Sequence, residues 1–313
     1  MSYLSALRET LDEVPEITRR IRKARQERAA RKEERSARRA ERRVQRGRRR
    51  SERESVRATE SPRVSLVRAP AHPVAADAPG TALAVASYNV HRWTGMNGRK
   101  APDPGRAGFV ISQLGADVIA LQEVLRPGRG EDPLERIADE LGLHLAFAGT
   151  RAHRQGELGN AILSRWPMTS VATLDLSLTR IEKRAAVAVE VDAGGTRFTV
   201  VATHLALVDR TRHRQVKLLL EHPHLRSGPV ILLGDMNAWR RCPATRALDR
   251  ALHEHDNPSW PATFPATRPM LALDRVYARG AKVTGLEAHD TFEARRASDH
   301  LPVLARVSLP IPR

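Results

Sequence analysis

Acidic, amide and imidazole side chains stand directly after several apolar runs of the sequence. Because such runs are typical of buried strands, the polar residues that end them would lie together at the rim of a sheet. These residues are Asn89, His91, Gln122, Glu123, His204, Asp235, Asn237, Asp299 and His300. Carboxylate and amide oxygens are the ligands of hard cations such as Mg²⁺ or Mn²⁺. The set therefore fits attack of water on a phosphoester. This reaction needs a metal, a base or orienting group for the water, and hydrogen-bond donors to the nonbridging oxygens.

A scaffold of strands and helices is predicted to position these groups. Short apolar, β-branched runs predict the strands, and they are ALAVASYNV, ADVIALQEV, NAILS, RAAVAVEV, RFTVVATHL, PVILLGDMN, DRVYA and LPVLARV. Helices are predicted near residues 104–114, 134–141, 212–220 and 244–252. Because strands and helices alternate too irregularly for a simple barrel, the pattern favours two packed sheets with helices outside.

Seven segments occur in an order that is similar to one known family. They are SYNVHRW, LQEV, GNAILSRWP, THLAL, GDMNAW, LDRVYA and SDHLPV. With them the region after the linker resembles the endonuclease/exonuclease/phosphatase superfamily, and the GD-x-N and SDH motifs with an upstream QE are the specific part. The resemblance implies an α/β fold, a four-layered α/β sandwich of two packed, mainly antiparallel sheets flanked by helices. It also implies a divalent-metal-dependent phosphodiesterase or phosphomonoesterase.

The resemblance assigns a metal shell and a group that activates water. Glu123 matches the principal metal ligand of the family, and Asn89 and Asp299 complete or support the shell around Mg²⁺ or Mn²⁺. Asp235 and Asn237 match the pair that orients and activates the attacking water and holds the phosphate. These five residues are the expected centre of the site.

The resemblance also assigns histidines and substrate contacts. His300 matches the essential histidine, and Asp274 matches the carboxylate that fixes its tautomer. Either Asp235 or His300 would serve as the general base. His204 matches a histidine that contacts the phosphate or protonates the leaving group in the nuclease and sphingomyelinase branches. Asn160 and Arg184 match positions that approach the substrate phosphate.

Two histidines bear on the substrate. Abasic-site nucleases resembling this family usually carry an acidic residue where His91 stands and a tyrosine where His204 stands. The sequence therefore argues against abasic-site DNA repair. The THLAL and GNAILSR segments are more similar to the branch of bacterial phosphodiesterases, sphingomyelinases and inositol-phosphate enzymes.

Composition divides the chain into three parts. Residues 1–60 form a tract rich in Arg, Glu and Ala, and most of the net charge of +17 lies in the first fifth of the chain. This basic arm has almost no large apolar side chains in its main part, so we expect it to be helical or disordered. Residues 61–81, rich in Pro and Ala, predict an extended linker. Residues 82–309 are the expected hydrolase domain.

The leading hypothesis is a metal-dependent phosphodiesterase that acts on nucleic acid or on a phospholipid or sugar-phosphate diester. The basic arm fits a nucleic-acid tether, an anchor to an anionic membrane surface or a solvated helix without a ligand. The alternative hypothesis is an inactive scaffold or recruitment module that works through this arm. The lone Cys242 and the lack of a run of roughly 20 apolar residues favour a cytoplasmic protein, or one peripheral to a membrane or nucleic acid.

Overall fold

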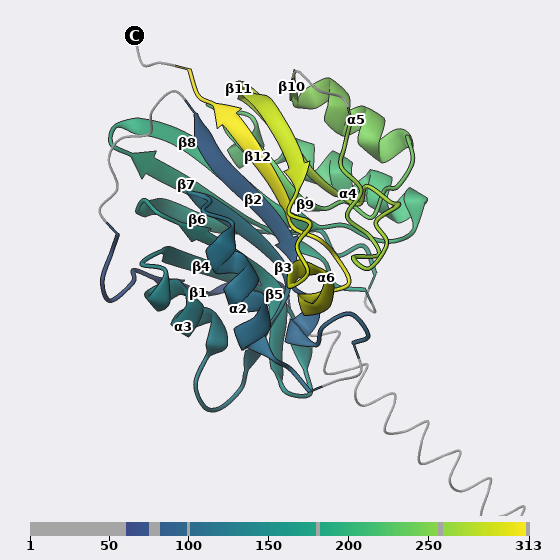
Figure 1. Cartoon of the computed structure of the whole chain (residues 1–313). Helices are drawn as coiled ribbons and strands as arrows, with labels where there is room; N and C mark the ends of the chain where they lie inside the picture. The colour runs from purple at the N-terminus through teal and green to yellow at the C-terminus, as the bar shows by residue number, and fades with distance from the viewer. Residues whose placement is uncertain (1–60, 75–81, 99–100, 180–181, 256–258, 311–313) are drawn as a thin grey trace, which may run out of the picture. The chain divides into compact units, whose positions relative to one another are not determined.

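The computed structural model describes residues 61–74, 82–98, 101–179, 182–255 and 259–310 (Figure 1). The basic arm predicted over residues 1–60 and part of the predicted linker, residues 75–81, lie outside the described residues. Within the described part of the chain, no helix is long and apolar enough to cross a membrane.

Twelve strands of the described residues form one hydrogen-bonded sheet, in the order β1-β4-β5-β3-β2-β12-β11-β9-β8-β7-β6, with β10 paired to β11. The strands of one half are β1 (Arg63–Arg68), β2 (Leu83–Asn89), β3 (Val118–Pro127), β4 (His144–His153), β5 (Gly156–Ser164) and β12 (Val303–Ser308). Those of the other half are β6 (Met168–Asp175), β7 (Ala185–Ala193), β8 (Thr196–His204), β9 (Val230–Asp235) and β10 (His253–His255). The long strand β11 (Asp274–Ala288) pairs with β9 through its first residues and with β12 through its last, so it joins the halves.

Helices connect the parallel strands and cover the sheet. Helix α2 (Pro104–Gln113) lies between the parallel strands β2 and β3, and α4 (Asp209–Glu221) lies between the parallel strands β8 and β9. Figure 1 shows α2 and α3 (Pro133–Glu140) over one half of the strands and α4 and α5 (Pro243–Ala251) over the other. Two short 3-10 turns, η1 (His91–Trp93) and η2 (Pro223–Leu225), and the short helix α6 (Ala294–Ala297) complete the described elements. Parallel pairs place the ends of both strands at the same edge of the sheet.

Three hydrophobic clusters explain why the strand sequences are continuously apolar. Strand β3 sends Ile119 and Leu121 into a cluster with α2 and α3, and it sends Val118 and Ala120 into a second cluster on its opposite face. The second cluster also contains residues of β7, β8 and β9, such as Val187. A third cluster joins α4 and α5 to the other face of those strands. Because many strands are buried on both faces, alternation between apolar and polar residues is lost.

The structure confirms the α/β class with a large sheet, the eight predicted strands and the four predicted helices. It adds three strands in the hydrolase region, β4, β6 and β10. It also adds β1 inside residues 61–81, where the sequence predicts only an extended linker. Strand β1 pairs antiparallel with β4, and Arg68 at its end pairs with Glu135 of α3 at 2.8 Å. Its side chains are alternately exposed and half-buried, which is why the sequence shows no apolar run there.

Candidate active site

Strand register brings the predicted polar residues to one edge of the sheet. Asn89 is paired with Gln122 across the parallel strands β2 and β3, and Asp235 stands between His204 and Asp274 in the neighbouring ladders. Gly234 allows this approach, since its φ is +150° and a Cβ there would lie 1.9 Å from the carbonyl oxygen of Thr203. The glycine of the GDMN segment is therefore required by close contact between β8 and β9.

Asp235 lies at the centre of the polar cluster. Asn89 Nδ2 donates to Oδ2 of Asp235 at 3.1 Å, and the backbone N–H of Asn237 donates to Oδ1 at 2.9 Å. The Nε2 atoms of His204 and His300 lie 3.4 and 3.6 Å from Oδ2. Burial raises the pKa of the Asp235 carboxyl to about 6, against the lowering effect of His300. Groups from β2, β8, the loop after β9 and the segment before β12 thus converge on one carboxylate.

His300 is held by a buried carboxylate. Its Nδ1 lies 2.8 Å from Oδ2 of Asp274, and Thr263 Oγ1 donates to the same oxygen at 2.6 Å. A proton on Nδ1 directs Nε2 toward Asp235. Burial lowers the pKa of His300, but the negative charges of Asp274 and Asp235 outweigh it and raise this pKa to about 10.

The surroundings of His204 shift its pKa in the opposite direction. Burial lowers its pKa well below the usual range, and the positive charges of Arg184, His300 and Arg151 lower it further. The site therefore combines a charged His300 with a neutral His204, both facing Asp235. Two histidines whose surroundings shift their pKa values in opposite directions are typical of sites that need both a proton donor and a neutral contact.

Two of the predicted metal ligands, Asn89 and Glu123, lie on the neighbouring strands β2 and β3, and the third, Asp299, lies in the segment before β12. Glu123 has a φ of +52° and sits in an irregularity of the β3–β5 ladder, which turns its side chain out of the regular strand pattern. Burial raises the pKa of Asp299, and the negative charge of nearby Glu123 adds to the rise. Asn89 accepts from the backbone of His91 at 3.0 Å through its Oδ1. Two close carboxylates and an amide oxygen form a donor set that suits a hard cation.

Basic side chains lie against these carboxylates. Arg92 Nε is 3.5 Å from Oε2 of Glu123, and His91 Nδ1 is 3.2 Å from Oδ1 of Asp299. A second group that could hold a cation consists of Asp235, Asp274 and His300, whose ligand atoms lie within 4.8 Å of one another. In that group, however, Nδ1 of His300 and one oxygen of Asp274 already bond to each other. We therefore interpret it as a hydrogen-bonded network.

Asn160 and Arg184 line a small cavity beside His204 and Glu123. Asn160 is buried, and its Nδ2 donates to the carbonyl oxygen of Ala185 at 2.8 Å, which ties β5 to β7. Arg184 pairs with Glu182 at 3.2 Å. The cavity has a volume of about 90 Å³. All ten residues expected at the site thus lie near the edge where β2, β8 and β9 end, beside the irregularity within β3, or line this adjoining cavity.

Sequence reasoning missed the residues that hold the site in place. Arg212 of α4 is buried, and its Nη1 donates to the carbonyl oxygen of Asn237 at 2.6 Å. Arg275 Nη2 donates to the carbonyl oxygen of Ala238 at 2.6 Å. Ser298 Oγ donates to the carbonyl oxygen of Asn89 at 2.6 Å. Ser298 stands in the SDH motif and Arg275 in the LDRVYA segment, so the sequence carries a signal for both, whereas Arg212 belongs to none of the seven segments.

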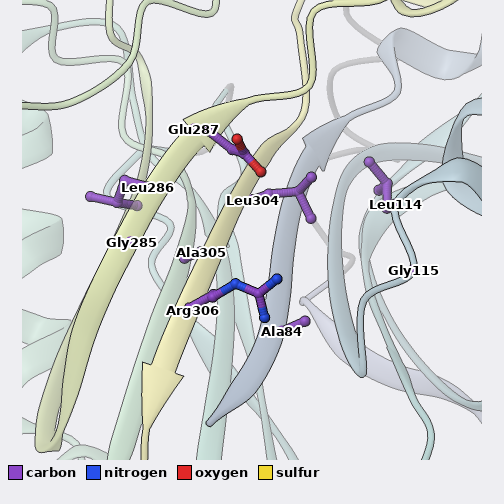
Figure 2. Close-up of a pocket in the computed structure, with 9 residues that line it drawn as sticks. All are labelled: Ala84, Leu114, Gly115, Gly285, Leu286, Glu287, Leu304, Ala305 and Arg306. Carbon is purple, nitrogen blue, oxygen red and sulfur yellow. The ribbon is translucent and has the colours of Figure 1, made fainter.

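A larger cavity of about 430 Å³ lies away from these residues, over β2, β11 and β12 beside the loop that follows α2 (Figure 2). Leu114, Leu286 and Leu304 line it, and its charged lining residues are Glu287 and Arg306. A single acidic and a single basic side chain do not supply the grouped donors that hydrolysis requires. The smaller cavity at the strand ends is therefore the one associated with the chemistry.

Comparison with known proteins identifies the family of the chain. The sequence model of the Endonuclease/Exonuclease/phosphatase family matches residues 95–300. The protein YbhP of Escherichia coli K12 is 30% identical over 255 residues, which cover 72% of this chain and 96% of YbhP.

Solved structures of the same fold include a mannosyl-6-phosphatase of Bacteroides thetaiotaomicron, with 19% identity, a TM-score of 0.58 and coverage of 73% of this chain and 100% of that one. They also include D. rerio TDP2 complexed with a single-strand DNA product, with 16% identity, a TM-score of 0.55 and coverage of 73% and 100%. At these identities the two structures support the fold alone.

Proposed function

Because the chain belongs to the Endonuclease/Exonuclease/phosphatase family, we propose that it is a divalent-metal-dependent hydrolase that cleaves a phosphodiester by attack of water. The observation that carries this proposal is the convergence on Asp235 of Asn89, His204 and His300, together with the bond between His300 and Asp274. A carboxylate bonded on both oxygens beside an oriented histidine is an arrangement typical of hydrolytic sites.

In the proposed mechanism, Asp235 orients the attacking water and accepts its proton. Asn89 and the backbone of Asn237 fix the carboxylate for that task. His300, kept positively charged by Asp274 and Asp235, donates from Nε2 to an oxygen of the phosphoryl group and stabilises its charge. The neutral His204, whose Nε2 lies 3.4 Å from Oδ2 of Asp235, would contact the phosphate.

Asn89, Glu123 and Asp299 would hold Mg²⁺ or Mn²⁺. Their donor set fits the ion, because oxygen ligands suit hard cations and a cation would offset the repulsion between Glu123 and Asp299. When bound, the ion would neutralise charge on the phosphoryl oxygens and polarise the ester.

The proposed substrates are nucleic acid or a phospholipid or sugar-phosphate diester. One neighbour in fold is named a mannosyl-6-phosphatase and another is bound to a single-strand DNA product, so this fold occurs both in an enzyme for a sugar phosphomonoester and in a protein that binds nucleic acid. We also propose the four-layered arrangement of the fold, which the hydrophobic clusters on both faces of the strands support. A reducing, cytoplasmic location is proposed from the single, buried Cys242.

The scaffold alternative is less favoured, because an inactive domain would be expected to have lost some of the converging groups. The basic arm over residues 1–60 is proposed to add affinity for a polyanion, either nucleic acid or an anionic membrane surface. Its support is the concentration of Arg in that segment.

The proposal is tested with full-length protein and a panel of phosphoesters in the presence of Mg²⁺, Mn²⁺ or a chelator. The panel holds abasic duplex DNA, single-stranded DNA, RNA, phosphatidylglycerol vesicles, inositol phosphates and bis(p-nitrophenyl) phosphate. We expect metal-dependent hydrolysis that is abolished in the Asp235→Asn, His300→Ala double variant.

The matched control is Asp192→Asn, since Asp192 lies at the opposite end of β7 from the site. Equal activity of the wild type and the double variant would show that the site is assigned wrongly. A wild type that hydrolyses no member of the panel would favour the scaffold.

A further inference from the structure

Large apolar side chains are exposed mainly at the edge of the sheet that carries the polar cluster around Asp235. Ten such side chains are exposed among the described residues, and six of them lie in segments that lead into or out of strand ends at this edge. These six, which we call the apolar rim, are Met96, Leu207, Val208, Trp239, Met270 and Phe292. Single exposed apolar residues are ordinary on a protein surface, whereas a group of them on one face marks an interaction site.

The apolar rim extends along five neighbouring strands. These strands are adjacent in the sheet, in the order β2, β12, β11, β9 and β8. Met96 follows β2, Phe292 lies between β11 and β12, Met270 precedes β11, Trp239 follows β9, and Leu207 and Val208 follow β8. Because Asp235 ends β9, the rim flanks the polar cluster on both sides.

One part of the rim is formed by the loops after β8 and β9. Arg212 Nη1 donates to the carbonyl oxygens of Leu207 and Asn237 at 3.0 and 2.6 Å, which holds the two loops together. Arg240 Nη2, next to Trp239, lies 3.4 Å from Oδ2 of Asp209. Leu207 is 71% exposed and Trp239 is 57% exposed. Leu207, Val208 and Trp239 thus project into solvent from loops that are fixed to each other.

The other part of the rim lies on the side of β2. A Cβ on Gly95, the neighbour of Met96, would lie 3.2 Å from the carbonyl oxygen of Arg296. The guanidinium of Arg296 in turn lies 5.2 Å from the centre of the Phe292 ring. Met96 and Phe292 therefore extend from backbone segments that contact each other.

Met270 lies between these two parts. Its backbone N–H donates to the carbonyl oxygen of Phe264 at 3.0 Å, and the ring of Phe264 lies 5.0 Å from the ring of His300. The exposed side chain of Met270 is thus one residue layer away from the polar cluster.

The segments that carry the rim have an excess of positive charge. Residues 94–98, 205–210, 236–241, 264–273 and 289–297 contain six arginines and three acidic residues. Two of the acidic residues, Asp209 and Asp290, pair with arginines of the same segments. The guanidinium of Arg240 lies 5.1 Å from the centre of the Trp239 ring, so cationic and apolar groups are interleaved.

Apolar tips between cations fit an anionic lipid bilayer better than nucleic acid. At a bilayer surface, aliphatic side chains enter the acyl boundary, tryptophan lies at the level of the headgroups, and arginines meet the lipid phosphates. Single-stranded nucleic acid is bound by stacking on aromatic rings, which the aliphatic Leu207, Val208 and Met270 do not offer. A protein partner that covered both sides of the polar cluster would close the site to its substrate.

We propose that the apolar rim is an interfacial binding surface that inserts into an anionic phospholipid bilayer and turns the polar cluster toward the headgroups. The surface belongs to the hydrolase domain and acts without the basic arm. Where the inference rests on the proposed function, it narrows the substrate to the phosphodiester of a membrane phospholipid.

The experiment measures insertion of Trp239 into vesicles by full-length protein, without divalent metal so that no lipid is hydrolysed. Vesicles of phosphatidylcholine and phosphatidylglycerol are prepared with and without bromine on the acyl chains, which quenches nearby tryptophan fluorescence. Trp239 is the most exposed tryptophan, whereas Trp93 and Trp166 are buried. We expect quenching in the wild type, and Trp239→Phe should remove most of it while the protein stays bound.

High salt separates the rim from the basic arm. Salt screens attraction between exposed charges, so binding by the arm alone should decline and should leave Trp239 unquenched. We expect the Leu207→Gln, Trp239→Gln double variant to lose about ten-fold or more of its vesicle affinity at high salt, measured by sedimentation.

The matched control is the Val67→Gln, Leu218→Gln double variant, which removes two exposed apolar side chains outside the rim and should keep the wild-type affinity. Equal melting temperatures would establish that both double variants are folded. Both should hydrolyse bis(p-nitrophenyl) phosphate as the wild type does.

Three results would overturn the inference. The first is a wild type that binds vesicles without quenching, or a rim variant that binds as tightly as the control. The second is equal insertion into vesicles of phosphatidylcholine alone, which would contradict the preference for an anionic surface. The third is a rim variant that loses affinity for single-stranded DNA, or loses self-association, while the wild type shows no insertion.

The two proposals fail separately. If Trp239 inserts but the protein hydrolyses no phosphoester, the interfacial surface stands and the proposed activity fails. If the protein hydrolyses soluble phosphodiesters in a metal-dependent manner without insertion, the activity stands and the interfacial surface fails.

Discussion

Two histidines face Asp235 and differ in charge because their surroundings differ. His300 bonds to the buried carboxylate of Asp274, whereas His204 lies near Arg184 and Arg151. The same residue type is thereby made a cationic donor in one place and a neutral contact in the other. Exchange of these roles would require changes in the residues around the histidines, since the imidazole itself has an ordinary pKa near neutrality.

Asp274→Asn should strongly reduce hydrolysis. An asparagine at this position cannot stabilise the charged form of His300 and favours the wrong tautomer, so we expect kcat to fall about 1,000-fold or more while KM changes little. Steady-state kinetics on a chromogenic phosphodiester gives both constants. Asp192→Asn is the control and should retain wild-type kinetics. A kcat within a factor of about three of the wild type would show that His300 does not depend on Asp274.

The loop after β9 is positioned by an element that carries no catalytic group. Arg212 of α4 donates from Nη1 to the carbonyl oxygens of Ala206, Leu207 and Asn237 at 2.9, 3.0 and 2.6 Å, and from Nη2 to Asp209. Asn237 has a φ of +49°, a left-handed conformation that needs such support. The helix that crosses from β8 to β9 thus also fixes the segment that is proposed to orient the water.

Arg212→Lys should therefore affect both activity and stability. A lysine keeps the charge but cannot reach several carbonyl oxygens at once, so we expect the free energy of unfolding to fall by about 2 to 3 kcal/mol. We expect kcat to fall about 100-fold through misplacement of Asn237. Chemical denaturation and steady-state kinetics measure the two effects. Arg214→Lys, at an exposed position on the same helix, should change neither. Loss of stability with unchanged kcat would show that Arg212 has only a structural role.

Strand β1 is attached to α3 by charged contacts that should respond to pH. The backbone N–H of Ala71 donates to Oδ1 of Asp139 at 2.9 Å and, together with the Arg68 guanidinium, holds the pKa of Asp139 below its usual range. A carboxyl whose pKa is lower in the folded state stabilises the fold above its unfolded pKa of about 3.9. That contribution is lost as the pH falls through the folded pKa.

Asp139→Asn should lower the melting temperature at pH 7 and make less difference at pH 3, because protonation of the carboxyl in the unfolded state has by then removed part of the stabilising contribution. Thermal unfolding of both proteins at the two pH values measures this. Glu140→Gln, an exposed position on the same helix, is the control and should leave the melting temperature unchanged. A difference that is as large at pH 3 as at pH 7 would contradict a charge-based attachment of β1.

At the scale of the whole molecule, the folded part extends further toward the N-terminus than its sequence pattern indicates. Strand β1 begins at Arg63 and pairs with β4, so it belongs to the folded domain. A truncation that tests the basic arm must therefore end before β1.

Removal of residues 1–60 should leave hydrolysis of bis(p-nitrophenyl) phosphate nearly unchanged and weaken binding to polyanions. The proposed catalytic groups all follow β1, whereas the arm holds most of the net positive charge. Binding to single-stranded DNA and to anionic vesicles, measured at two salt concentrations, should decline with salt in the full-length chain. Removal of residues 1–68 is the comparison and should also lower the melting temperature, because it deletes β1. Equal loss of hydrolysis and binding on removal of residues 1–60 would show that the arm belongs to the active site.

The sequence by itself determined the family, the α/β class, most strands and the polar residues at their ends. These features are local, because a buried strand consists of consecutive apolar residues and the strand-end motif follows directly after them. The roles of Asn89, Glu123, Asp235 and His300 as ligand, water-orienting or phosphate-binding groups stay predictions. The structure supports them by placing these groups together.

Only the tertiary structure decided which distant groups meet. The pairing of β1 with β4, the bonds of Arg212 and Arg275 to the loop after β9, and the cavity that joins Arg151 to Lys183 depend on contacts between segments far apart in the chain. A hydrogen bond to a backbone carbonyl requires no particular residue at the accepting position, so the sequence around the acceptor carries no motif for it. Residues from different strands that line one cavity likewise share no motif in the sequence.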